Sequence, residues 1–217
     1  KIDPDFIKNN NYYLNTTDAM ATGGTQINVG KSFTQSLIGT VMEIPFAFGS
    51  ANYRWSTKEQ YVDTVVYAAY RKELFEKIGY FEENITISED AEFNWRIRQA
   101  GYKILYSPNI ISYYYPRNSI KKFIQQIYRY GKLRVNVIKK HSDAVKLLHL
   151  VPPIFVIVMA LLLVSSLFSP VAQVMFLSLI IFYFLMNISF SFLKTYPEKL
   201  KFLFFIPFLV FFMHIAW

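Results

Sequence analysis

The sequence predicts a mixed α/β domain, followed by a basic amphipathic helix and then by transmembrane helices. Helical and strand-like hydrophobic patterns alternate up to about residue 116, which is typical of a sheet covered by helices. Lys and Arg gather in residues 121–146, and residues 147–193 contain no Asp, Glu, Lys or Arg. We therefore expect three consecutive segments: a domain over 1–116, an interfacial helix over 117–146 and a membrane region over 147–217.

Within the first segment, Gly and Pro residues mark where the expected helices and strands end. Residues 33–48 have mixed helical spacing that ends near Pro45, and helical spacing predicts helices over residues 4–14, 71–78 and 91–100. Gly79 and Gly101 stop the last two, and Phe93 shares a core face with Ile97. Strands are expected over residues 19–24, 61–70 and 102–106, the last closed by Pro108.

Nearly all of the net basic charge lies in one segment. The formal net charge of +8 divides into −1 for residues 1–120, +7 for 121–146 and +2 for 147–217. This distribution indicates attraction to anionic lipid headgroups and not a nucleic-acid surface. The chain has no Cys, which excludes disulfides, thiolate nucleophiles and Cys-based zinc sites.

The apolar run from Leu147 to Leu193 is long enough for two membrane crossings. Ser169-Pro170 breaks it into helices expected at about 147–168 and 171–193, and a third span begins near Phe202 and reaches the last residue, 217. Basic residues flank both crossings on one side, so the positive-inside rule predicts a multi-pass protein of the cell membrane with a cytoplasmic first domain. The alternative is a very apolar soluble bundle.

Two adjacent carboxylates, Glu89 and Asp90, precede a helical segment. Their residue pattern alone leaves two interpretations open. Ser88 can cap the helix, and acidic side chains in a first turn interact favourably with the helix dipole. The functional interpretation is a general base, since a carboxylate in a cleft can take the proton of an attacking sugar hydroxyl.

A second candidate site follows at Gln126, Arg129 and Tyr130. Side chains at positions i, i+3 and i+4 share a helix face, and guanidinium binds phosphate oxygens through paired hydrogen bonds. Apolar side chains on a neighbouring face predict a helix lying on the membrane surface. The alternative is a plain interfacial helix whose Arg binds lipid.

Other local patterns give no site. Gly23-Gly24 and Gly30-Lys31 fit neither dinucleotide-binding nor P-loop spacing. The three His residues lie in or beside the apolar half, and no two have the spacing of metal ligands.

Taken in order, these stretches resemble the C-terminal part of a membrane-associated family 2 glycosyltransferase. They resemble in particular the enzymes of the succinoglycan type of exopolysaccharide biosynthesis. The resemblance rests on residues 21–40, 61–83, 88–108 and 124–134, followed by the apolar hairpin and residues 214–217.

The resemblance implies a GT-A-like nucleotide-diphospho-sugar transferase fold and inverting transfer with a divalent metal, Mg or Mn. It implies that Asp90 is the base and that Glu89 shapes the acceptor site. Asp63, Thr64, Gly23 and Gly24 fall where an acceptor would bind. Gln126, Arg129 and Tyr130 match a Gln-x-x-Arg-Trp motif, with Tyr in place of Trp.

The resemblance also implies the partners, which are a nucleotide-sugar donor, a lipid-linked or glycan acceptor, and membrane lipids. The family's metal-binding Asp-x-Asp motif would precede this region, because Pro4 and its position argue against Asp3-Pro4-Asp5. No metal ligand is therefore assigned here, and we expect a fragment that is inactive alone. The alternatives are a processive polysaccharide synthase and a non-enzymatic, membrane-anchored, lipid-binding scaffold.

Overall fold

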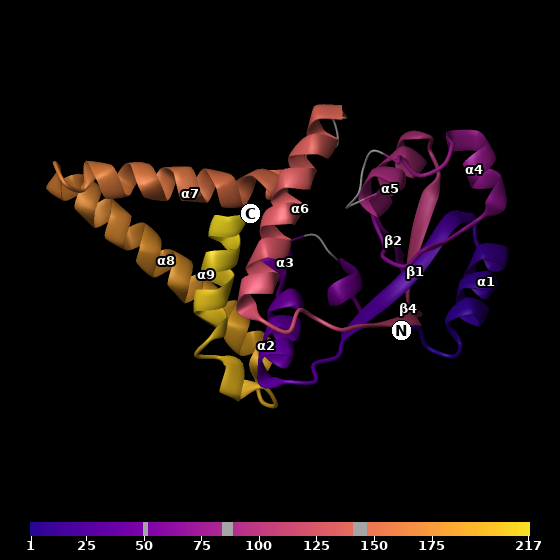
Figure 1. Ribbon diagram of the computed structural model, residues 1–217, viewed down its shortest axis with the longest axis horizontal. Helices are drawn as coiled ribbons and strands as arrows, with labels where there is room; N and C mark the ends of the chain where they lie inside the picture. Colours follow the sequence, from indigo (N-terminus) through magenta and orange to yellow (C-terminus); the bar gives the residue numbers. More distant parts are fainter. Residues whose placement is uncertain (50–51, 84–88, 141–146) are drawn as a thin grey trace. The chain divides into compact units, whose positions relative to one another are not determined.

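A computed structural model describes residues 1–49, 52–83, 89–140 and 147–217 (Figure 1). Contacts divide the chain into two compact units. Unit 1 comprises Lys1–Lys31, Ala51–Pro116 and Leu133–Ala144, and unit 2 comprises Ser32–Ser50, Arg117–Lys132 and Val145–Trp217. This division interleaves parts of the three consecutive segments expected from the sequence, and each unit is described by itself.

Unit 1 is built on a four-stranded sheet with the order β2-β4-β1-β3. The two long central strands, β1 (Ala19–Asn28) and β4 (Lys103–Tyr114), pair in parallel. The short strands β2 (Gln60–Tyr61) and β3 (Ala69–Tyr70) add antiparallel pairs on either side. The predicted mixed α/β class is confirmed.

The described part of unit 1 also contains the helices α1 (Phe6–Thr16), α4 (Lys72–Ile78) and α5 (Glu89–Gln99) and the short 3₁₀ helix η1 (Asn52–Arg54). The main core joins α4 and α5 to the sheet through Leu74, Phe93, Ile97, Ile104 and Tyr106, each at most 1% exposed. The expected helix over 71–78 is confirmed, and it ends at Gly79, whose φ of 79° suits a residue without a Cβ.

Two strand predictions in unit 1 are wrong. Residues 61–70 form strand only at their two ends, because the middle runs along α5 and not along the sheet. Strand β4 continues past Pro108, because residues 108–110 bulge out between the pairs Gly24↔Ser107 and Thr25↔Ile111. A bulge accommodates Pro, which lacks the N–H that a regular ladder requires.

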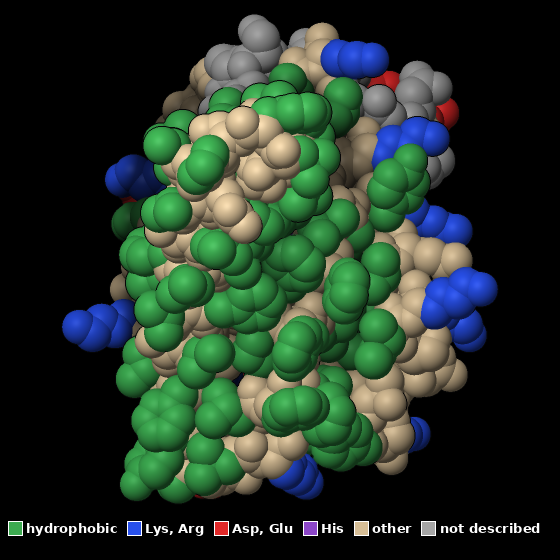
Figure 2. Space-filling view, turned by 90° about the vertical axis from the view of Figure 1, so that its left-hand side faces the viewer, with side chains coloured by type: hydrophobic (Ala, Val, Ile, Leu, Met, Phe, Trp, Pro, Cys, Tyr) green, Lys and Arg blue, Asp and Glu red, His purple; other side chains and the backbone are tan. Residues whose placement is uncertain are grey.

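Unit 2 is helical. It contains α2 (Phe33–Met42), α3 (Pro45–Phe48), α7 (Leu147–Ser165), α8 (Pro170–Thr195), η3 (Leu200–Phe202) and α9 (Ile206–Ala216). Helix α6 (Ile120–Lys140) begins in unit 2 and ends in unit 1. Helices α7 and α8 are long and apolar enough to cross a membrane, whereas α9 has 11 residues. Figure 2 shows hydrophobic side chains covering the α7–α8 side of the molecule.

Helices α2 and α3 pack on the long helices, although their sequence lies between two strands of unit 1. The Glu43 carboxylate pairs with Lys194 at 3.0 Å and with Lys199 at 3.7 Å. The Phe46 ring lies 5.5 Å from the rings of Tyr183 and His214, centroid to centroid. The segment from 32 to 49 therefore packs against the apolar half of the chain through ion pairs and aromatic contacts.

Candidate functional site

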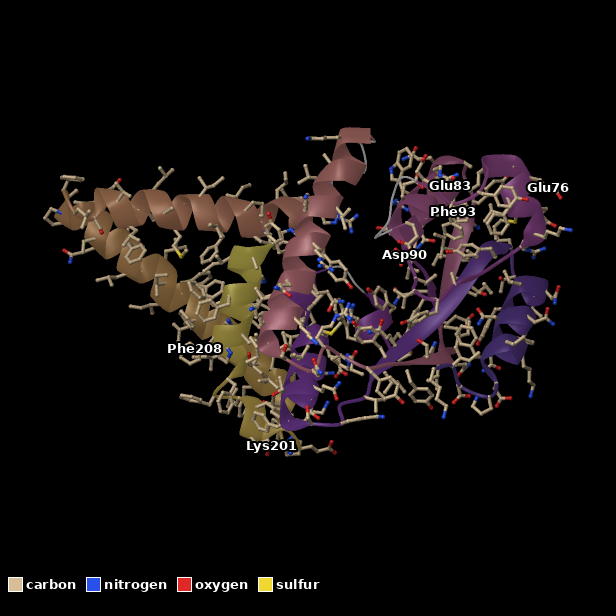
Figure 3. The ribbon with its side chains drawn as sticks, in the orientation of Figure 1. Glu76, Glu83, Asp90, Phe93, Lys201 and Phe208 are labelled. Atoms are coloured by element: carbon tan, nitrogen blue, oxygen red, sulfur yellow. The ribbon has the colours of Figure 1, made fainter. Side chains whose placement is uncertain are left out.

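Helix α5 carries the predicted base, Asp90, at its N-terminal end (Figure 3). Acidic residues occupy its first turn, and Arg96 and Arg98 occupy its last, which matches the helix dipole at both ends. Phe93 and Ile97 are fully buried and fix the helix against the core, so the predicted core face is confirmed. Ser88, the proposed cap, lies outside the described residues.

A second face of α5 carries Asp90, Asn94 and Arg98, which recur at four-residue spacing. The Asn94 Nδ2 donates to the Thr64 Oγ1 at 2.8 Å and to the Val65 carbonyl oxygen at 3.2 Å. Arg98 lies 3.4 Å from the Asp63 carboxylate. The structure therefore brings the predicted residues Asp63 and Thr64 to the same helix face as Asp90.

Asp90 is half-buried, and burial raises the pKa of its carboxyl above the usual range. Its Oδ1 accepts a hydrogen bond from the Ala91 N–H at 2.7 Å, which opposes that rise. The neighbouring charge of Glu89 adds to the rise, and the Arg134 guanidinium opposes it. A carboxylate that holds its proton more tightly than usual is suited to general-base work.

The other predicted acceptor residues have different surroundings. Glu89 is exposed at the start of α5, next to Asp90. Gly23 and Gly24 are buried in β1, where a Cβ on Gly24 would lie 2.1 Å from the Ile110 carbonyl oxygen. These glycines permit the close approach of the β4 bulge, and their role in acceptor binding stays a prediction.

The three residues of the arginine motif lie on α6 within unit 2. Gln126 is buried, and its Nε2 donates to the Tyr130 hydroxyl at 2.7 Å. Arg117 donates to the Gln126 Oε1 at 3.2 Å, whereas Arg129 is exposed. A hydrogen bond therefore links Gln126 to Tyr130 on this helix, and Arg129 remains accessible to solvent.

Sequence reasoning missed two residues of unit 1 whose charges act on Asp90 or are affected by it. Burial lowers the pKa of Arg134, and the charge of Asp90 opposes that shift. Burial raises the pKa of Tyr67, and the charge of Asp90 is among the smaller causes of the rise. Arg134 ends the stretch 124–134 that carries the family resemblance, and this was the signal available for it. Tyr67 lies within residues 61–70, where the sequence predicts a strand.

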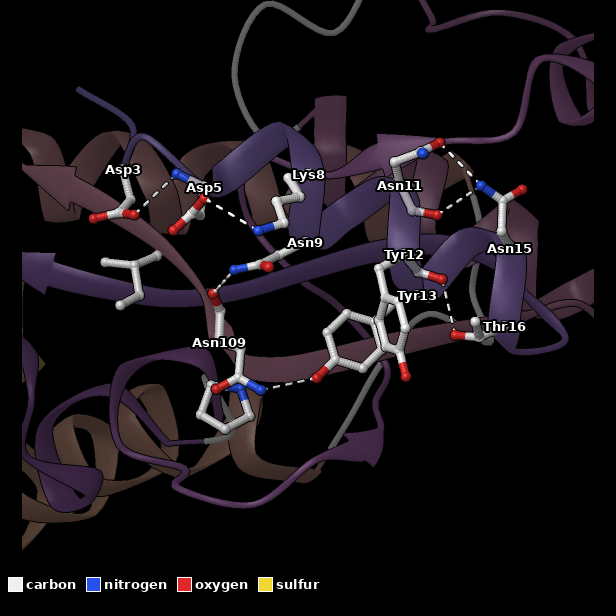
Figure 4. Close-up of a pocket in the computed structure, with 12 residues that line it drawn as sticks. Asp3, Asp5, Lys8, Asn9, Asn11, Tyr12, Tyr13, Asn15, Thr16 and Asn109 are labelled. Carbon is white, nitrogen blue, oxygen red and sulfur yellow. Dashed lines mark hydrogen bonds and ion pairs between the residues drawn. The ribbon is translucent and has the colours of Figure 1, made fainter.

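The described residues contain no group of three or more His, Cys, Asp or Glu side chains that would hold a metal ion. Asp3 accepts a hydrogen bond from the Asp5 N–H at 3.1 Å, and Asp5 lies 3.9 Å from Lys8. These carboxylates line an open pocket along α1, beside residues 108–111 of β4 (Figure 4). That pocket contains none of the predicted site residues.

The family model described as "Glycosyl transferase family group 2" matches residues 2–215. The chain belongs to this family. Membership supports the enzymatic interpretation over the non-enzymatic scaffold, and it agrees with the resemblance carried by the ordered motifs.

Two relatives illustrate the family's range. One is the "Dolichyl N-acetyl-alpha-D-glucosaminyl phosphate 3-beta-D-2,3-diacetamido-2,3-dideoxy-beta-D-glucuronosyltransferase" of Methanococcus voltae. It is 31% identical over 143 residues, covering 63% of this chain and 44% of the relative. The other is "Succinoglycan biosynthesis protein ExoA" of Rhizobium meliloti (strain 1021), 27% identical over 140 residues, covering 62% and 42%. The chain thus spans less than half the length of these relatives.

Proposed function

We propose that the full-length family 2 glycosyltransferase moves a sugar from a nucleotide-diphospho-sugar to a lipid-linked or polysaccharide acceptor. Transfer inverts the anomeric centre and serves exopolysaccharide or cell-surface glycan synthesis. The observation that carries the proposal is the half-buried Asp90, whose pKa burial raises, on the helix face that also holds Asp63 and Thr64. The names of the two relatives support the same class of reaction.

Asp90 acts as the general base. It takes the proton of an acceptor hydroxyl as that oxygen forms a bond to the anomeric carbon of the donor. The bond from this carbon to the diphosphate oxygen breaks, and the electron pair leaves with the nucleotide diphosphate. Glu89, Asp63, Thr64, Gly23 and Gly24 shape the acceptor side. For Asp63 and Thr64, this assignment draws support from their contacts with Arg98 and Asn94 of α5.

The arginine motif serves the departing diphosphate. Guanidinium is suited to phosphate oxygens, and Arg129 is exposed on α6. The bond between Gln126 and Tyr130 stiffens the same turn of the helix. A divalent metal, Mg or Mn, would neutralise the diphosphate in the full-length enzyme. Its ligands are expected upstream, and the described residues of this chain give no step through it.

The same proposal places the reaction at the cytoplasmic face of the cell membrane. Helices α7 and α8 have 19 and 26 residues and an apolar composition suited to two crossings. Basic residues of the 121–146 segment and around Lys199 fall on one side of this hairpin. Contact with anionic lipid headgroups would then hold the enzyme near a lipid-linked acceptor.

The decisive experiment replaces Asp90 in the full-length protein. Asp90→Asn is expected to lower turnover by about 10²–10⁴-fold, the usual contribution of a general base. Glu76→Gln, which removes an exposed carboxylate on α4, is the matched control and should leave turnover unchanged. Release of nucleotide diphosphate from a panel of nucleotide sugars measures turnover, and NMR of the product's anomeric proton tests inversion. Retained turnover in Asp90→Asn rules out the base assignment.

A further inference from the structure

Residues 63–67 run alongside α5 in the opposite direction. Asp63 contacts Arg98, and Thr64 and Val65 contact Asn94, one helical turn nearer the N-terminus of α5. The segment therefore runs toward the N-terminal end of α5, where Asp90 lies one turn beyond Asn94. Tyr67 follows Val65 by two residues, and the charge of Asp90 acts on its hydroxyl.

The fold holds Tyr67 between two fixed points. Val65 is fully buried in the core of unit 1, and β3 at Ala69–Tyr70 pairs with β1. Between them, the Tyr67 backbone has a φ of 50°, in the left-handed region that L-residues rarely adopt. Tyr67 is 51% exposed despite this backbone conformation. A strained residue with a solvent-facing ring indicates a functional constraint more than a packing one.

The charges around Tyr67 agree with this placement. Burial is the largest cause of its raised pKa, and Tyr114, Tyr53 and Asp90 add to the rise. Arg54 opposes it, and the Arg54 guanidinium lies 4.9 Å from the Tyr53 ring centroid. Tyr67 therefore belongs to a cluster of rings and charges that includes the proposed base.

We propose that the Tyr67 ring is the platform on which the acceptor sugar stacks while Asp90 takes the proton of its attacking hydroxyl. The inference rests on the proposed transfer reaction and adds a specificity-determining residue to it. A pyranose presents C–H groups on its face, and an aromatic ring offers a flat apolar partner for them. Half of the Tyr67 surface is open to solvent, so a sugar can reach the ring.

Two substitutions separate the ring from the backbone. Tyr67→Phe keeps the ring and loses the hydroxyl. Tyr67→Asn loses the ring, and Asn tolerates the left-handed region better than most residues. Tyr12→Asn, at a 60% exposed tyrosine on α1, is the matched control. The full-length enzyme is assayed with the UDP-sugar that gives turnover and with a polyisoprenyl diphosphate bearing one hexose as the acceptor.

We expect Tyr67→Asn to raise the KM for the acceptor at least tenfold, with a much smaller change in the KM for the donor. Tyr67→Phe should stay within about threefold of wild type, because stacking on an aromatic face does not require the hydroxyl. Tyr12→Asn should change neither constant. Tyr67→Gly, which removes the ring and relaxes the backbone, replaces the Asn variant if thermal unfolding shows that the latter does not fold.

Three results would overturn the platform. They are an unchanged acceptor KM in Tyr67→Asn, a rise confined to the donor KM, and equal losses in Tyr67→Phe and Tyr67→Asn. Failure of the underlying reaction has a different signature, since Asp90→Asn would then retain turnover whatever Tyr67 does.

Discussion

Helices α5 and α8 each carry a row of polar side chains at four-residue spacing. The two rows differ in the burial and the hydrogen-bond partners of these side chains. On α5 the row is Asp90, Asn94 and Arg98, and on α8 it is Tyr183, Asn187, Ser191 and Thr195. Every member of the α8 row is buried and hydrogen-bonded within unit 2. The α5 row instead begins at a half-buried carboxylate whose pKa is raised.

The difference teaches how one spacing serves two purposes. In an apolar helix, a polar side chain must find a partner inside the bundle, and α8 does this through Asn187 bonding the Pro207 carbonyl at 2.9 Å. On α5, Asn94 and Arg98 contact residues 63–65, and Asp90, the proposed base, lies at the end of the row. We therefore expect changes in the α8 row to affect stability and changes in the α5 row to affect turnover.

The largest expected effect comes from pH. A base works only when it is deprotonated, so kcat/KM should fall about tenfold per pH unit below the pKa of Asp90. Burial raises this pKa, so the acidic limb should lie above the usual range of aspartate. A pH profile of the full-length enzyme checks this. An acidic limb at an ordinary aspartate pKa would contradict the environment described for Asp90.

The raised pKa of Asp90 also determines whether folding stability rises or falls with pH. The folded state binds the Asp90 proton more tightly than the unfolded state does, so stability from this group is present at low pH. It is lost as pH rises from the unfolded to the folded pKa. Asp90→Asn should consequently unfold at the same or a slightly higher temperature at neutral pH, which separates loss of turnover from loss of fold.

The next effect tests the α5 row through Asn94. Asn94→Ala removes both hydrogen bonds to residues 64 and 65, and the free energy of unfolding should fall by about 1–3 kcal/mol. Turnover should fall with it, because the segment beside Asp90 loosens. Asn15→Ala, which removes an exposed amide on α1, should change the free energy of unfolding by less than about 0.5 kcal/mol. Unchanged turnover in Asn94→Ala would show that the position of residues 63–67 does not matter for the reaction.

Local pattern was enough to predict much of unit 1. The helix over 71–78 combines apolar spacing with a Gly stop, and the structure has it at Lys72–Ile78. Phe93 and Ile97 were correctly assigned to the core, because i,i+4 spacing alone determines a shared helix face. The carboxylate pair and its helix were likewise visible, because acidic residues at the start of a helix form a local signal.

Contacts between distant segments were not predictable from local pattern. Residues 61–70 are rich in β-branched and aromatic side chains, yet their middle is held by Asn94 from α5, about 30 residues away in the chain. The packing of residues 32–49 on α8 and α9 depends on Glu43 meeting Lys194 and Lys199, far along the sequence. The proximity of Tyr67 and Arg134 to Asp90 was unpredictable for the same reason, since no short-range pattern links either of them to Asp90.

A smaller effect tests the α8 row. Asn187→Ala leaves the Pro207 carbonyl without its side-chain donor, and the expected loss of stability is about 1 kcal/mol, within the range measured for hydrogen bonds between apolar helices. Ser189→Ala, at an exposed position on the same helix, serves as its control. Thermal unfolding in detergent and the turnover of the folded fraction check both variants. Loss of turnover without loss of stability in Asn187→Ala would assign the α8 row to function.

The smallest effect on stability belongs to the ion pair between Asp63 and Arg98. Asp63 is about half exposed, and such pairs contribute about 0.2–1 kcal/mol, less at high salt. Asp63→Asn should therefore barely alter unfolding, while the acceptor KM should rise several-fold if Asp63 lines the acceptor site. A double-mutant cycle with Arg98→Gln isolates the pair from the acceptor contact. If the acceptor KM changes only through the coupling with Arg98, then Asp63 positions the segment that bears Tyr67 and does not itself bind the sugar.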